Sequence, residues 1–376
     1  MKALILVSCL VASVTAAQTS PPAPDKPVPA AFEFSGILFA NFQYSGGEKG
    51  RSANRFDVER AYLNFQTPVR DRLAVRVTTD LFQQAAPGSD NFYRGWIIRA
   101  KYAYLNYTYV DNSNWRASAR AGLLQTVFIE HDEKTWSRWL STSPTERAGY
   151  FSSADAGVST TVSFPARLGE VYATVTNGPG YTSREIDRFK DFAARITITP
   201  WARDTVGNLR GVALTAWGYR GQTASRFVDG GQGQTGSVGS GLQRDRFGFH
   251  VASSTPALSV AAQYARRIEE GETGANSPLS PRQIVDSTGT MLSAYATVRP
   301  FLLLRGSALP LSVLARLDRV TSNRETRSRH DVAIVGLLYA LSKTVSVALD
   351  YQETTPVSQS NIVPVKTYFA HLVARY

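Results

Sequence analysis

Apolar and polar residues alternate along most of this chain, and the pattern is clearest at its end. Five apolar residues there occupy every second position: Tyr368, Ala370, Leu372, Ala374 and Tyr376. Successive side chains of a strand point to opposite sides, so these five share one face. An alternating strand that ends in an aromatic residue suits a closed transmembrane barrel, whose last strand shows an apolar face to lipid and pairs with the first strand.

The same period-two pattern begins after residue 31 and continues to the terminus, interrupted by turns. A strand of about ten residues, with a rise of ~3.3 Å per residue and a tilt of ~45°, covers most of the ~25 Å apolar band of an outer-membrane barrel. The alternation therefore predicts about sixteen strands. They are residues 32–44, 57–66, 72–80, 100–110, 115–124, 156–164, 171–176, 192–199, 212–219, 247–253, 258–265, 292–299, 311–320, 331–340, 345–352 and 365–376.

The connections between these segments alternate in length. Short turns such as DNSN at 111–114 and ALSK at 340–343 interleave with long polar loops such as 222–244 and 268–288. A rhythm of short turns at one end and long loops at the other is typical of barrels with periplasmic turns and extracellular loops. The predicted fold is an all-β, transmembrane antiparallel β-barrel of about 16 strands, spanning residues 32–376.

The N-terminal segment has the composition of a secretory signal peptide. Lys2 precedes an apolar run at 3–14 and small residues that end at Ala17, so we expect a signal peptide over residues 1–17. Residues 18–31 are rich in proline and predict an extended periplasmic linker. Cys9 is the only cysteine and lies in the signal peptide, which excludes disulfides and thiolate metal sites from the mature chain.

The charge balance narrows the class of partner. The formal net charge is +11, and removal of Lys2 with the signal peptide leaves +10. In a secreted chain this excess favours contact with anionic lipopolysaccharide, or with anionic solutes inside a pore, over binding of nucleic acid. No stretch after the signal peptide is continuously apolar over the length that a transmembrane helix requires.

The connection between the fifth and sixth predicted strands, residues 125–155, is long enough that we expect a function for it. Its centre, residues 131–140, predicts a short helix with acidic residues early and two tryptophans for packing. Folded into the barrel, the connection would narrow the pore and bring three cations near the inner wall: Lys134, Arg138 and Arg147. The alternative is a loop that caps the barrel on the outside.

Arginines on the strands are the other candidates for solute contact. Six of them alternate with apolar residues and should face the lumen, because a charge on the lipid face costs ~2–4 kcal/mol at the membrane midplane. They are Arg60, Arg76, Arg116, Arg120, Arg195 and Arg316. Permanently charged guanidinium groups bind oxyanions and favour anions in a pore. We expect Arg76, Arg116 and Arg120 to join the three loop cations in one positive zone at the narrowest level.

The alternative for these arginines is structural. They could pair with carboxylates of the barrel wall, for which four acids have suitable positions: Glu33, Asp80, Asp318 and Asp350. In that case their charge would be neutralised within the wall.

The sequence does not favour an enzyme. Its four histidines, His131, His250, His330 and His371, lack metal-ligand spacing. The triplet at 131–133 (HDE) has no accompanying serine motif, and adjacent residues of a helix diverge. We expect no catalytic activity, no cofactor and no metal.

Four segments together resemble a known family. They are ERAYLNF (59–65), AGLLQTVFIEHDEKTWSRW (121–139), TNGPG (176–180) and the terminal strand. With them the chain resembles bacterial outer-membrane porins, specifically the phosphate-selective porin O and P family. Members of that family often have two arginines before the alanine of the second strand, and here Glu59 takes the first place. The resemblance implies a sixteen-stranded barrel, usually a homotrimer, with the third long loop folded into the lumen.

The leading prediction of function is passive diffusion of small hydrophilic solutes across the outer membrane, with a preference for anions such as phosphate or other oxyanions. One alternative is a sugar-specific channel in which Tyr102, Tyr104 and Trp136 form a stacking surface. Another is a structural or adhesive barrel that holds the envelope through its proline-rich linker. Single-channel conductance and ion selectivity would separate these alternatives.

Overall fold

The computed structural model describes residues 32–46, 53–83, 95–185, 187–204, 208–224, 241–273, 283–306, 309–357 and 364–376. The predicted signal peptide and linker lie outside these residues.

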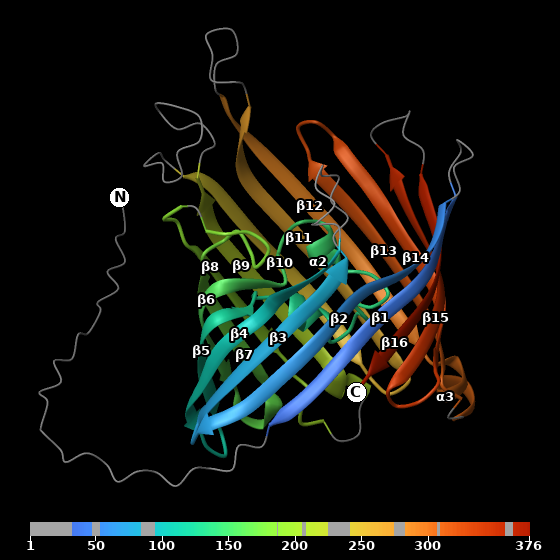
Figure 1. The fold of residues 1–376 in the computed structure, drawn as a ribbon, viewed down its shortest axis with the longest axis horizontal. Helices are drawn as coiled ribbons and strands as arrows, with labels where there is room; N and C mark the ends of the chain where they lie inside the picture. The colour runs from blue at the N-terminus through green and yellow to red at the C-terminus, as the bar shows by residue number, and fades with distance from the viewer. Residues whose placement is uncertain are drawn as a thin grey trace, which may run out of the picture.

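The described residues form one closed barrel of sixteen antiparallel strands, each paired with its neighbours in the sequence (Figure 1). The strands are β1 (Glu33–Gly46), β2 (Ala53–Arg70), β3 (Leu73–Gln83), β4 (Trp96–Asp111), β5 (Arg116–Gln125), β6 (Ala154–Ser163), β7 (Gly169–Thr176), β8 (Asp191–Ile198), β9 (Val212–Thr223), β10 (Leu242–Ser254), β11 (Leu258–Thr273), β12 (Gln283–Val298), β13 (Leu311–Asn323), β14 (Ser328–Ala340), β15 (Val345–Pro356) and β16 (Val365–Arg375). The predicted strand number and fold class are confirmed.

The first and last strands close the barrel as the terminal pattern predicts. The Gly36 amide donates to the Tyr376 carbonyl at 2.8 Å, and the Tyr376 amide donates back to the Gly36 carbonyl at 3.1 Å. The Tyr376 ring lies over Gly36, where a Cβ atom would be 2.2 Å from the ring. Glycine at this position therefore makes room for the C-terminal aromatic ring.

Side chains of β16 alternate between the two faces of the wall as expected. His371 and Val373 are buried on the inner face, whereas Tyr368 and Leu372 are exposed on the outer face. Each strand contributes one apolar face to the outer surface in this way, so every backbone group can pair within the wall while lipid meets apolar side chains.

Two of the predicted long loops are shorter than expected. β11 continues to Thr273 and β12 begins at Gln283, so most of the predicted loop at 268–288 is strand. β9 and β10 likewise extend into the predicted loop at 222–244. Apolar alternation ends at the height of the lipid, but main-chain pairing between adjacent strands can continue beyond it in water, where both faces are polar.

Short connections lie at one end of the barrel, with α3 (Pro300–Arg305) and the 3₁₀ turns η2 (Pro165–Arg167) and η3 (Asn208–Gly211). Figure 1 shows α3 at the lower end of the barrel. Among the described residues, no helix is long and apolar enough to cross a membrane.

Candidate functional site: the connection between β5 and β6

Residues 126–153 link β5 to β6 and contain two short helices, α1 (Ile129–Asp132) and α2 (Pro144–Arg147). The predicted helix at 131–140 is wrong in extent, because the helical backbone ends at Asp132. Trp136 and Trp139 would share one face of a helix. Instead Trp136 packs edge-to-face on Tyr295 of β12, and Trp139 meets His371 of β16. Contacts with distant strands thus position these side chains, rather than helical periodicity.

The first half of the connection is fixed by α1. Phe128 packs on Trp217 of β9 with 5.6 Å between ring centroids. The His131 ring accepts a hydrogen bond from Arg195 of β8 and lies 3.0 Å from the Thr215 hydroxyl of β9. Burial, reinforced by the neighbouring Arg195 charge, lowers the pKa of His131 to about 2. The histidine is therefore neutral and acts as a hydrogen-bonding anchor.

Asp132 is a second anchor, with a fully buried carboxylate. It accepts hydrogen bonds from the Tyr295 hydroxyl and from Gln263 Nε2 at 3.2 Å, on β12 and β11. Burial raises the pKa of Asp132 to about 6, although these two hydrogen bonds oppose the shift. His250 Nε2 of β10 lies 3.9 Å from the carboxylate. The side chains of His131 and Asp132 thus point to different partners on different strands, while Glu133 pairs with Arg138 inside the connection.

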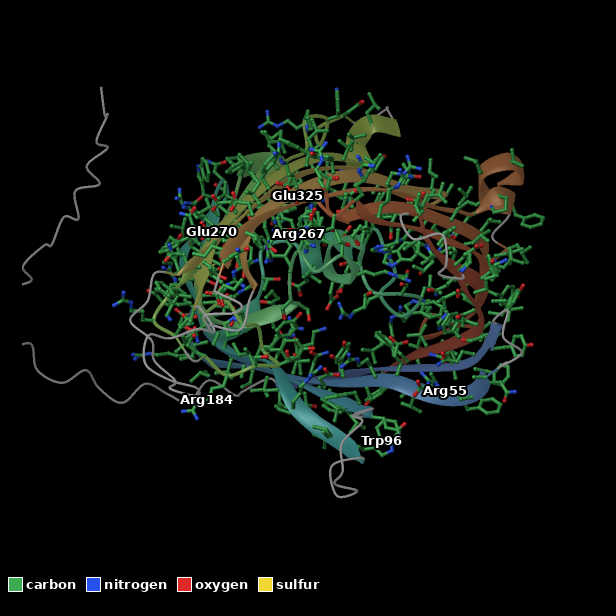
Figure 2. The ribbon with its side chains drawn as sticks, turned by 90° about the horizontal axis from the view of Figure 1, so that it is seen from above. Arg55, Trp96, Arg184, Arg267, Glu270 and Glu325 are labelled. Carbon is green, nitrogen blue, oxygen red and sulfur yellow. The ribbon has the colours of Figure 1, made fainter. Side chains whose placement is uncertain are left out.

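The second half is held by main-chain contacts with the opposite wall. Arg316 of β13 donates to the Thr142 carbonyl at 2.7 Å, and its guanidinium group lies 4.9 Å from the Trp136 ring centroid. Gln352 of β15 donates to the Leu140 carbonyl at 2.9 Å. Arg267 of β11, labelled in Figure 2, donates to the Ala148 carbonyl at 3.4 Å. The connection therefore contacts inner-face side chains of strands from β8 to β16.

Four of the predicted arginines and one loop arginine pair with carboxylates. Arg60 lies 2.8 Å from Asp80 across β2 and β3, Arg195 lies 2.8 Å from Glu170, and Arg316 lies 2.6 Å from Asp318. Arg138 contacts Glu133 and, at 2.5 Å, Glu146, all three within the connection. Arg76 lies 3.8 Å from Glu130. Arg60 and Arg316 thus form the wall salt bridges that the structural alternative predicts, with Asp80 and Asp318 as their partners.

Other predicted cations have neutral partners or weaker pairing. Arg120 of β5 donates to Asn106 at 3.2 Å and to Gln125 at 3.0 Å. Arg147 donates to Ser141 and Thr354 hydroxyls. The Lys134 ammonium is 3.8 Å from Glu170, and its side chain is 63% exposed.

Arg116 lies away from the connection, outside the positive zone predicted for it. It is the first residue of β5, exposed beside the short turn at 112–115, and it pairs in register with Asp111 and Ser163. Arg120 lies four residues farther along β5, next to the connection. Alternation places both arginines on one face, but their heights differ.

Two cavities lie between the connection and the wall formed by β16 and β1 to β8. One of about 300 Å³ is lined by Arg76, Lys101, Glu130, Glu133, Arg138 and Arg375, among others. The other, of about 130 Å³, is lined by Arg120, Glu130, Lys134, Glu170 and Arg195, among others. Together they present seven cationic side chains against three carboxylates, because Glu130 borders both. The arrangement can attract small anions to the space beside the connection.

Lys101 is one of two lining cations that sequence reasoning missed, and Arg375 is the other. A bulge between Thr78 and Thr79 pairs them with Tyr102 and Ala100, which leaves Lys101 without a partner on β3. Simple alternation would place Lys101 opposite Tyr102, yet both are buried, and the Lys101 ammonium lies 4.1 Å from the Tyr62 ring centroid. The sequence carries no clear signal for this bulge.

Among the described residues, no group of three or more His, Cys, Asp or Glu side chains is placed to hold a metal ion.

The closed sixteen-stranded wall, with its apolar outer face, defines a β-barrel of the bacterial outer membrane. Solved structures share this fold. They include OmpF of Salmonella typhi in complex with daunomycin (12% identity, 92% of this chain and 97% of that one, TM-score 0.59). They also include an anion-selective porin from Comamonas acidovorans (9% identity, 92% and 100%, TM-score 0.58) and outer-membrane-expressed OmpT of Vibrio cholerae (12% identity, 93% and 99%, TM-score 0.56).

At these identities the likeness establishes the fold, which is that of general porins. No protein-family model and no curated protein matches the sequence. The finer resemblance to the phosphate-selective porins stays a prediction.

Proposed function

We propose that this protein is an outer-membrane porin through which small hydrophilic solutes diffuse passively, with a preference for anions. In this proposal residues 126–153 fold into the lumen and form its constriction. The excess of cations around the two cavities is the observation that carries the proposal. Fixed positive charges at a narrow level raise the local concentration of anions and lower that of cations.

The charges are arranged with the cationic side chains of the wall facing acids of the connection. Arg76, Lys101 and Arg120 come from β3, β4 and β5, whereas Glu130 and Glu133 come from α1 and the turn after it. Such an arrangement sorts solutes by charge and size without a cofactor or a catalytic step, because the solute only exchanges part of its hydration for contacts with the wall.

The descriptions of two structural neighbours support the proposal. One is described as an anion-selective porin of Comamonas acidovorans, and an in-vitro folded form of Vibrio cholerae OmpT is described as a trimer. By analogy we propose that this chain is also a trimer in the outer membrane, in contact with lipopolysaccharide. Phosphate is one candidate solute, since guanidinium groups bind small oxyanions in general.

The sugar-channel alternative has less support. Tyr102, Tyr104 and Trp136 are all buried, the tryptophan against Tyr295 and Arg316. Rings with so little exposed surface offer little area for stacking on a passing sugar.

Ion selectivity in planar bilayers tests the proposal. With purified protein and a KCl gradient, the reversal potential should show anion preference near 0.1 M salt. The preference should fade near 1 M, because the Debye length falls from ~10 Å to ~3 Å. A cation preference at low salt, or the absence of stepwise conductance, would contradict the proposal.

A further inference from the structure

A row of small residues crosses the outer face of the barrel wall. The residues are direct neighbours in register on five successive strands, β5 to β9, and each faces outward between larger side chains. They are Ala119, Thr160, Ala173, Ala194 and Gly218. Tyr107 of β4 and Phe247 of β10 continue the same row and bound it at its two ends. With strands about 4.8 Å apart, the row of small residues spans about 20 Å across the sheet.

Larger residues flank this row, so that it forms the floor of a groove. Leu105, Val158 and Phe192 occupy the adjacent row, and the last two are 53% and 58% exposed. The hollow has a volume of about 1050 Å³ and an almost entirely apolar lining. The outer wall of a barrel is otherwise convex, so an apolar concavity of this size calls for an occupant.

The same sector has the shortest strands of the barrel. β7 and β8 have eight residues each, whereas β1 has 14 and β2 has 18. Eight residues at a rise of ~3.3 Å and a tilt of ~45° cover about 19 Å, less than the ~25 Å apolar band of such barrels. An apolar surface too short for the bilayer thins the lipid around it or associates with another protein surface.

The distribution of aromatic residues differs between this sector and the seam where β1 meets β16. At the seam, Phe34 pairs with Tyr376 near one edge and Tyr44 with Tyr368 near the other. These pairs form the two aromatic belts expected where a barrel meets the lipid headgroups.

The strands of the short sector contain fewer aromatic residues, although Trp115 and Phe164, which flank β5 and β6 at the short-turn edge, pack against each other there. β5 and β6 contain no aromatic residue. The one aromatic residue of β7, Tyr172, is buried and donates to the Gln125 carbonyl on the inner side. Along β5, β6 and β7 the sector thus presents only small and aliphatic side chains outward, whereas Phe192 of β8 is an exposed aromatic residue.

We propose that the groove on β5–β9 is a contact face between copies of this chain, occupied by the outer wall of a second copy. The proposal rests on the proposed trimer and assigns the surface that forms it. Small residues let two walls approach closely, as they do in membrane interfaces generally. A second copy also covers the sector where the wall is too short for lipid. In a closed ring of three copies, each copy offers this face to one neighbour and an adjoining face to the other.

Site-directed spin labelling tests which face is covered. The only native cysteine lies in the predicted signal peptide, so Ala119→Cys, Ala173→Cys and, as a control on β13, Ala315→Cys each introduce a single thiol. Ala315 is also an outward alanine in mid-strand. With nitroxide labels in lipid vesicles, collisions with molecular oxygen should be several-fold fewer at 119 and 173 than at 315. Equally frequent collisions at all three positions would show that lipid fills the groove.

A second pair of variants tests the consequence. Ala119→Trp should convert the oligomer to monomers by native mass spectrometry, while Ala315→Trp leaves it intact. Both variants should keep anion-selective conductance, which shows that the barrel still folds. Trimers that persist in Ala119→Trp would overturn the assigned face. An unmodified protein that is monomeric yet anion-selective would overturn this proposal and leave the proposed pore function standing.

Discussion

Charge reversal at the cavities should change ion selectivity in steps that follow the charge count. The two cavities carry seven cations and three carboxylates. The double replacement of Arg76 and Arg120 by glutamate makes the count five and five, so the anion preference should disappear. Adding Lys134→Glu makes it four and six, and the channel should then prefer cations.

The size of each step follows from Coulomb's law. A unit charge about 4 Å from a permeating ion is worth about 1 kcal/mol in water. Each arginine-to-glutamate replacement changes the local charge by two, hence by about 2 kcal/mol before screening. Since ~1.4 kcal/mol corresponds to a factor of ten, the ratio of chloride to potassium permeability should fall about tenfold or more per site at 0.1 M salt.

The assay is the reversal potential in planar bilayers, with folding of each variant checked by its heat-modifiable mobility on gels. Arg116→Glu is the matched control, because Arg116 is exposed at the start of β5 and lines neither cavity. It should change selectivity far less than Arg120→Glu. The reasoning is refuted if the Arg116 control shifts the reversal potential as much, or if the double variant keeps the original preference.

Three further predictions concern assembly, conductance and pH. Deleting Tyr376, whose ring covers Gly36 and whose main chain closes the barrel, should impair outer-membrane assembly but not secretion, as seen by fractionation and heat-modifiability; normal assembly would contradict this. Shortening residues 132–140 should raise single-channel conductance, and an unchanged value would mean that the connection caps the outside. Burial raises the pKa of Asp132 from 3.8 to about 6, so its carboxyl stabilises the docked connection fully below about pH 4 and loses this contribution as pH rises through 6. The free energy of unfolding should therefore decrease by up to about 3 kcal/mol between pH 4 and 7, which a lower thermal midpoint would report. Asp132→Asn should flatten this dependence.

The sequence by itself determined the wall of this protein. Period-two alternation identified all sixteen strands, and the terminal pattern of Tyr368 to Tyr376 correctly predicted closure against the first strand. The physical reason is that lipid requires every backbone group to be paired and every outward side chain to be apolar. Both requirements act on each residue and its neighbours in the sequence, so the pattern can be recognised without knowing which strands pair.

The tertiary structure alone decided what the inner side chains do. Alternation assigns a residue to a face, but strand register sets its height and neighbours. Arg60 thus meets Asp80, while Arg116 lies at the end of the barrel and Arg120 beside the connection.

Bulges and distant contacts add what no local pattern carries. A bulge turns Lys101 inward, and contacts with β12 and β16 rather than helical spacing place the two tryptophans of the connection. The row of small residues on β5–β9 also exists only because five registers align them, since their sequence positions are far apart and share no motif. Register is a property of strand pairs, and it forms only when the chain closes on itself.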